Sequence, residues 1–313
     1  MKRLFLIVSV LFCGLPLRAQ ADGACDNKRA LVFVPSGLQK SELTDAKSVF
    51  FPLSPAIRST FSRVACHWMI ANAVDSKTTL KENGRLALEQ ILKWHSADSD
   101  RRELPIEVIA HGIGGLFALE AISLNQQQDK KLSFEKAHLI STPLRGLELA
   151  NILKSNLIVR DQLTLLFETN YPSFKLGRTF DYTSEKIEEF LSSLNLPSSL
   201  ELNTYSGTQA ESKAGNASEN EYTHLSSLLS GFSFLIENTN DGLISRRSAL
   251  STFEQSPAVE KNSIKIVSHP DMHLNLDHFE QVTDPRHLKG ISRASANKIE
   301  LRQREFFESL LTN

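Results

Sequence analysis

The residues with the clearest chemical pattern lie in one short turn, Ala110–Gly114, which reads AHGIG. The turn follows the apolar run Ile106–Ile109 and precedes the helical pattern Gly115–Leu124. In a strand–turn–helix setting, a G-x-S-x-G turn presents a serine that attacks an ester or amide carbonyl. Here Gly112 stands at the nucleophile position, and glycine has no side chain with which to attack. The pattern therefore predicts a scaffold for acyl transfer whose nucleophile position is degenerate.

Acyl transfer also needs an imidazole that accepts a proton and a carboxylate that orients the imidazole. Asp241, in the stretch NDGLI, is the candidate carboxylate, although an Asp-Gly pair is often only a turn. His278, in LDHFEQ, is the candidate imidazole, and His273 in the same short window is the alternative. The chain order of nucleophile position, acid and histidine is the order expected for this kind of turn.

Backbone donors for a developing oxyanion are predicted at two places. The loop Pro35–Leu38 follows the first strand after residue 21, and its Gly37 allows a ligand to approach the backbone. We expect the backbone N–H groups of Leu38 and Ile113 to be the donors. Two alternatives would keep catalysis without a serine at position 112, namely a water activated by His278 or attack by Ser36 from this loop.

Strand-like runs and helical patterns alternate along the chain, which predicts a parallel sheet covered on both faces. The predicted strands are Ala30–Pro35, Val64–Ala71, Ile106–Ile109, Ala137–Ile140 and Ser263–Val267, and the predicted helices outside the middle of the chain are Thr79–Trp94, Gly115–Leu124 and Asn297–Leu311.

The segment from about 146 to 197 gives helical patterns and no clear strand. Within it, Thr183–Leu194 is amphipathic, with apolar residues at helical spacing. Two interpretations stay open, a lid over the site and an ordinary surface helix. Residues 209–221 are polar and predict a loop.

The N-terminal residues indicate export. Lys2 and Arg3 precede the apolar run Leu4–Leu17, and Ala19–Ala21 fits a signal-peptidase site. The apolar run has about 14 residues, which is short for a membrane-spanning helix. We therefore predict a signal peptide at 1–21, one domain at 22–313, and a secreted or periplasmic protein.

The charge and the cysteine content bear on which ligands the protein binds and on whether it forms a disulfide. Removing residues 1–21 changes the formal net charge from −1 to −4, and the chain has no basic tract, which argues against nucleic-acid binding. Cys25 and Cys66 then remain, each at or before the start of a predicted strand. In an oxidising compartment they predict one disulfide, with two unpaired thiols as the alternative.

Five stretches together resemble bacterial triacylglycerol lipases and esterases of the α/β-hydrolase superfamily. They lie at 31–38, 108–116, 139–149, 240–244 and 277–281, in the family's order, and the stretch LISTPLRGLEL at 139–149 is close to the family's I-S-T-P-H-R-G-S. The chain departs from the pattern at Gly112 and at Ser36, where the family has the nucleophile and a histidine.

The resemblance implies an α/β-hydrolase fold with a mostly parallel central sheet, helices on both faces and a helical lid-like insertion. It implies a lipid or ester small molecule as ligand, with peripheral contact to membrane lipid left open, and no cofactor. Some relatives hold a structural calcium, for which Glu221 and Glu280 are the nearest counterparts here, but glutamates at these positions are weak evidence and we expect no metal.

Three hypotheses for function follow. The first is a pseudohydrolase that binds an acyl or ester-bearing ligand with catalysis absent or impaired. The second is an active carboxylic-ester hydrolase that uses His278-activated water or an unrecognised nucleophile. The third is a scaffold that has lost the pocket.

Overall fold

The computed structural model describes residues 26–36, 53–71, 78–158, 160–162, 181–207, 240–250, 264–272, 276, 278, 280–287 and 292–312. The predicted signal peptide, the 209–221 loop and Cys25 lie outside these residues. Within them, no helix combines the length and the apolar character needed to cross a membrane.

The described strands form one six-stranded sheet in the order β2-β1-β3-β4-β5-β6, and every neighbouring pair is parallel. Apolar side chains on both faces of the inner strands are buried, as expected for a parallel sheet covered on both sides. The strands are β1 (Asp26–Val34), β2 (Ala65–Ile70), β3 (Ile106–His111), β4 (Phe134–Ile140), β5 (Glu201–Tyr205) and β6 (Lys265–Ser268).

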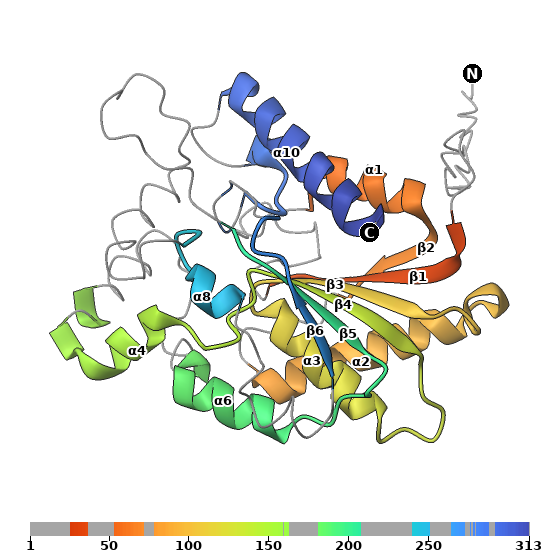
Figure 1. Ribbon diagram of the computed structural model, residues 1–313, viewed down its shortest axis with the longest axis horizontal. Coiled ribbons are helices and arrows are strands. Elements are labelled where there is room, and N and C mark those ends of the chain that lie inside the picture. The colour runs from red at the N-terminus through yellow and green to blue at the C-terminus, as the bar shows by residue number, and fades with distance from the viewer. Residues whose placement is uncertain are drawn as a thin grey trace, which may run out of the picture.

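Helices cover both faces of the sheet (Figure 1). Helices α1 (Pro55–Val64) and α10 (Arg293–Thr312) share a core with Leu31 and Phe33 of β1. Alternate residues of β1, Ala30 and Val32, face the opposite core, which is closed by α2 (Leu80–Ser96), α3 (Gly114–Asn125) and α6 (Ser184–Ser193). The shorter helices are α4 (Glu148–Ser155), α8 (Arg246–Ala249) and the 3₁₀ turns η1 (Ser99–Arg101) and η4 (Pro285–His287).

Local sequence explains where the helices begin. The Thr79 side chain accepts a hydrogen bond from the Glu82 backbone N–H at 3.2 Å, which caps α2 as its sequence predicts. The Ser54 hydroxyl likewise accepts from the Ala56 N–H at 3.2 Å, and Pro55 occupies the first turn of α1. The apolar patterns did not predict α1, although the Ser54 cap and Pro55 are typical of a helix start.

Two other boundaries differ from the sequence prediction. Val64 ends α1 instead of beginning a strand, because β2 starts only at Ala65. Strand β5 was not predicted at all, since Glu201 and Asn203 break its apolar pattern. Their polar side chains belong to a hydrogen-bonded network on the sheet, described below.

The predicted helical insertion falls between β4 and β5. Of its described part, α6 places Ile187, Phe190 and Leu191 in the same core as α2 and α3. This packing is that of a surface helix on the sheet. Residues 163–180 lie outside the described residues, so a lid in that part of the insertion stays a prediction.

Gly84 allows α2 and α3 to pack closely, and it carries a first testable expectation. A Cβ at Gly84 would overlap the Cβ and Cγ atoms of Glu120 on α3. We expect Gly84→Ala to destabilise the protein by about 1–3 kcal/mol through overpacking, despite the roughly 1 kcal/mol gained in helix propensity. Urea unfolding measures this, with exposed Lys93→Ala in the same helix as control. A more stable Gly84→Ala protein would contradict the packing argument.

Candidate active site

The site lies where the carboxyl ends of β1 and β3 meet. These strands are parallel neighbours with Val34 opposite Ala110, so Ser36 and Gly112 follow their strands at the same level. Gly112 has φ = +55°, in the left-handed region that favours glycine. Its N–H donates to the Ile140 carbonyl at 2.9 Å, and its carbonyl accepts from the Gly115 N–H at 3.1 Å. These bonds fix the tight turn between β3 and α3.

Asp241 and His278 are brought together as a buried pair. The Nδ1–H of His278 donates to Oδ2 of Asp241 at 2.9 Å, and their side chains are 2% and 0% exposed. Asp241 Oδ1 accepts from the backbone N–H groups of Leu243 and Ile244 at 3.1 and 2.7 Å. A neutral imidazole with a proton on Nδ1 carries its lone pair on Nε2, the arrangement required of a general base.

The turn that carries Asp241 is built by its own sequence. The side chain of Asn240 accepts from the Gly242 N–H at 2.7 Å, and Gly242 has φ = +94°. The backbone N–H of His278 donates to the Asp241 carbonyl at 2.9 Å. The two segments are therefore tied together by backbone as well as by side chain.

The nearest neighbours of the missing side chain at Gly112 are His278 and Ser36. A Cβ built on Gly112 would lie 2.8 Å from Nε2 and 3.1 Å from Cε1 of His278, and 3.1 Å from Cβ of Ser36. Thus the basic nitrogen points at the nucleophile position. The imidazole also lies closer than a real side chain at position 112 would allow.

Gln281 joins this pair to a second histidine, a connection that the motifs did not reveal. Its Nε2 donates to Asp241 Oδ2 at 3.0 Å, and its Oε1 accepts from Nε2 of His111 at 3.2 Å. The rings of His111 and His278 are 4.5 Å apart. No described residue bonds to Nδ1 of His111, which is fully buried.

Burial and neighbouring charge set the protonation of these groups. Burial alone would raise the pKa of Asp241, but the charge and hydrogen bond of His278, with the backbone N–H groups of Ile244 and Leu243, hold this pKa below its ordinary value. Desolvation, followed by the charge of His278, holds the pKa of His111 well below its ordinary value. His111 is therefore neutral at neutral pH.

The other predicted site residues are only partly described. Ile113 precedes α3, and none of the described residues accepts a hydrogen bond from its backbone N–H. Leu38 and His273 lie outside the described residues, so the second oxyanion donor and the rival histidine stay predictions.

Metal binding gains no geometric support within the described residues, where no group of three or more His, Cys, Asp or Glu side chains is arranged to hold an ion. Glu280 is buried there, and its carbonyl accepts a hydrogen bond from Gln303 at 2.6 Å. Glu221 lies outside the described part of the chain.

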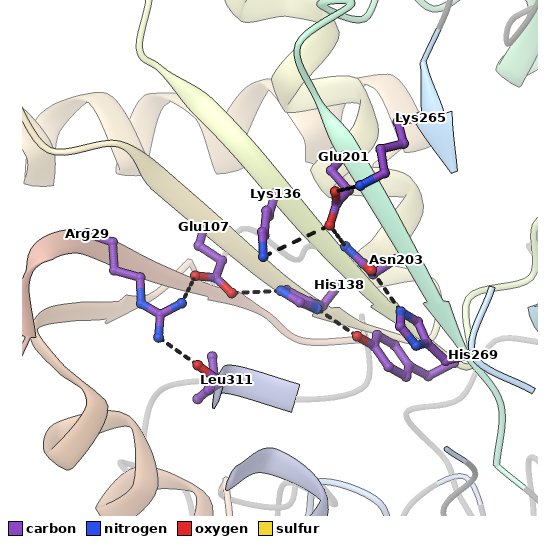
Figure 2. Close-up of polar contacts among 10 residues, drawn as sticks. Arg29, Glu107, Lys136, His138, Glu201, Asn203, Lys265, His269 and Leu311 are labelled. Carbon is purple, nitrogen blue, oxygen red and sulfur yellow. Dashed lines mark hydrogen bonds and ion pairs between the residues drawn. The ribbon is translucent and has the colours of Figure 1, made fainter. Parts of the chain in front are cut away.

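A second polar cluster crosses the sheet on the α1 and α10 face (Figure 2), and sequence patterns gave no sign of it. Arg29 binds both Glu107 and the Leu311 carbonyl, and Glu107 accepts from Nε2 of His138 at 2.7 Å. Nδ1 of His138 lies 3.0 Å from the Tyr205 hydroxyl. We call these four side chains, Arg29, Glu107, His138 and Tyr205, the sheet network.

The sheet network continues toward β6. The Tyr205 ring stacks on His269 with centroids 4.6 Å apart, and His269 hydrogen-bonds to Asn203 at 2.8 Å. Asn203 in turn donates to Glu201 at 3.1 Å, and Glu201 pairs with Lys265. These contacts explain the polar residues of β5.

Gln281 provides a second testable expectation. Replacing Gln281 with methionine removes a donor from Asp241 and leaves the buried Nε2–H of His111 without its acceptor. We expect a loss of about 1–3 kcal/mol in the free energy of unfolding. Thermal unfolding at neutral pH measures it, with exposed Gln128→Met as the matched control. Equal melting temperatures for the two variants would show that the Gln281 bridge contributes nothing.

Solved structures similar to this chain include lipases and esterases. A metagenomic carboxyl esterase matches with a TM-score of 0.60 at 15% identity, covering 92% of this chain and 76% of that one. The Staphylococcus hyicus lipase matches with a TM-score of 0.57 at 14% identity over 91% and 95% of the two chains. Lipase 1 from Pelosinus fermentans gives 0.54 at 13% identity over 92% and 98%.

These likenesses, with the parallel sheet and its two helical layers, establish the α/β-hydrolase fold and confirm the predicted fold class. At such low identity they show the fold alone. No protein-family model and no curated protein matches the sequence.

Proposed function

We propose that this protein is a lipase- or esterase-like pseudohydrolase, which binds an acyl or ester-bearing ligand and has strongly impaired ester hydrolysis. The observation that carries the proposal is the Asp241–His278 pair, which is hydrogen-bonded and buried beside Gly112. The base and its carboxylate have the geometry of an acyl-transfer site, whereas the nucleophile position has no side chain.

The ligand class follows from the fold and from the site together. The similar structures are described as a carboxyl esterase and lipases, so ester and lipid ligands are the natural first class. The Ile113 N–H at the start of α3 would receive the ligand's carbonyl oxygen, because a helix N-terminus favours negative charge.

Export and a disulfide belong to the same proposal. The predicted signal peptide would send residues 22–313 to the periplasm or the medium. Asp26 pairs with Ala65 in the β1–β2 register, so the residue after Cys25 lies opposite the residue before Cys66. A Cys25–Cys66 bridge would then tie together the first ends of two neighbouring strands. Thiol alkylation of the exported protein before and after reduction tests it.

The ligand proposal is tested by binding. Purified protein is titrated with glycerol monolaurate and with p-nitrophenyl butyrate, and the melting temperature and ester cleavage are followed in parallel. We expect the melting temperature to rise with ligand concentration, as for any ligand that binds only the folded state. Steady-state cleavage should stay close to the rate in buffer. Rapid turnover by the wild-type protein would reject the pseudohydrolase, and no thermal shift with either compound would reject this ligand class.

A further inference from the structure

Ser36 carries a hydroxyl that has no role in a site built around the turn Ala110–Gly114. The residue follows β1 and is 3% exposed. None of the described residues forms a hydrogen bond with this hydroxyl.

Ser36 lies close enough to His278 for its hydroxyl to approach the imidazole. Cβ of Ser36 and Nε2 of His278 lie 3.1 and 2.8 Å from the same point, the position of a Cβ on Gly112. The two atoms are therefore no more than about 6 Å apart. Rotation about χ1 of serine moves the hydroxyl among three staggered positions. Since no described residue holds it, the hydroxyl is able to turn toward the imidazole.

Gly112 is what leaves the path between them open. Any side chain at position 112 would place its Cβ within 3.1 Å of Ser36 Cβ and 2.8 Å of His278 Nε2. Glycine removes that obstacle. The glycine in the turn Ala110–Gly114 thus leaves room for the serine on the loop after β1 to reach the same imidazole.

We propose that Ser36 is a relocated nucleophile, which together with His278 and Asp241 forms an acyl-serine intermediate with carboxylic esters. This inference rests on the proposed function for its ligand class, and it adds a slow covalent reaction to the binding described there. The nucleophile then comes from the loop after β1, its base from the segment around His278, and the carboxylate that orients the base from the turn at Asp241.

The proposed reaction has two balanced steps. Ser36 Oγ bonds to the ester carbonyl carbon while Nε2 of His278 takes the hydroxyl proton. The bond to the leaving alkoxide then breaks, and the imidazolium returns the proton to release an alcohol. In the second step water attacks the acyl group with His278 as base, which yields a carboxylic acid and restores Ser36. Ile113 follows Gly112 and caps the N-terminus of α3, so its backbone N–H is placed to stabilise the oxyanion.

The test is a burst experiment with p-nitrophenyl acetate. We expect wild-type protein to release close to one equivalent of p-nitrophenol per chain and then turn over slowly. Acid quenching, digestion and mass spectrometry should place the acetyl group on Ser36. Ser36→Ala should slow acylation by about 100-fold or more, as expected when a nucleophile is removed.

Two variants separate a chemical role from a structural one. Ser36→Cys keeps a nucleophile at the same position, and its reaction with iodoacetamide should slow when His278 is replaced by alanine. Ser206→Ala is the control, because Ser206 is likewise a buried serine. We expect its burst to equal that of the wild type.

A burst that survives Ser36→Ala, acetylation at another residue, or no acetylation in folded wild-type protein would each overturn the proposal. Ligand-induced thermal shifts would be unaffected by any of these results. A failure of Ser36 as nucleophile is therefore distinguishable from a failure of the proposed ligand class.

Discussion

Gly112→Ser is expected to give this protein steady ester hydrolysis, at least about 100-fold above the wild-type rate on p-nitrophenyl butyrate. The new hydroxyl would stand beside Nε2 of His278, which Asp241 already orients from the other side. Loss of a triad serine costs up to about 10⁶-fold in kcat, so even incomplete restoration gives a large signal. Initial rates of p-nitrophenol release measure it.

The geometry also sets a limit on this gain. A Cβ at position 112 lies only 2.8 Å from His278 Nε2, so the imidazole must move by a few tenths of an ångström. The positive φ adds backbone strain of about 1–3 kcal/mol for a residue with a side chain. We therefore expect a lower melting temperature together with the new activity.

Three further variants identify the source of the gained activity. Gly112→Ala introduces the same Cβ without a nucleophile and should hydrolyse the ester no faster than the wild type. Gly112→Ser/His278→Ala should lose the activity, because the introduced serine then has no base. Gly112→Ser/Ser36→Ala should keep it, because the serine introduced at position 112 is itself the nucleophile. Activity in Gly112→Ala at the level of Gly112→Ser would refute this assignment.

The largest loss of stability is expected from Glu107→Gln in the sheet network. Glu107 is buried and accepts from both Arg29 and His138, so replacing its carboxylate with an amide leaves the half-buried Arg29 guanidinium without its anion and one of the two donors without an acceptor. Breaking a buried pair in this way costs about 3–5 kcal/mol. This is a large share of the roughly 5–15 kcal/mol that stabilises a typical domain. Urea unfolding at pH 7 measures the change.

The stability difference between wild type and Glu107→Gln should depend on pH, which tests whether the charge of Glu107 causes it. Burial would raise the pKa of Glu107, but the hydrogen bond and charge of His138, with the charge of Arg29, hold it below the ordinary value of 4.5. Its ionised form therefore stabilises the fold above about pH 4.5, and this contribution is lost as the pH falls through the lowered pKa. The gap between wild type and Glu107→Gln should narrow on acidification.

An exposed pair supplies the control for this substitution. Glu89 pairs with Arg85 on the solvent side of α2, and both side chains are about half exposed. Glu89→Gln should change stability by less than about 1 kcal/mol, because exposed ion pairs contribute little. If Glu107→Gln and Glu89→Gln were equally mild, the sheet network would have no stabilising role.

Short-range patterns were enough to predict most of the α/β alternation. Each of β1, β3 and β4 contains a run of mostly apolar residues that is buried on both sides, and α2 carries its start signal in Thr79. The missed strand β5 shows where this reasoning stops. Glu201 and Asn203 look like loop residues until the partners that satisfy them are known, and those partners are far away in the sequence.

Some residues of the candidate site could also be predicted from the sequence, and others could not. Motif order was sufficient to single out Asp241 and His278, which the structure places together. The role of Gln281 could not be predicted, because an isolated glutamine has no characteristic spacing to Asp241 or His111. The approach of Ser36 to His278 likewise depends on the register of β1 with β3, which no local pattern specifies.

The contact between Arg29 and the Leu311 carbonyl has a consequence for how the chain folds. It joins residues 282 positions apart in sequence, and α1 packs against α10 on the same face of the sheet. Strand β1 is thus made early in synthesis but cannot be fully covered until the last helix has emerged from the ribosome. Contacts of such long sequence separation slow folding. If the proposed signal peptide directs export, this delay would help to keep the chain unfolded until it has crossed the membrane.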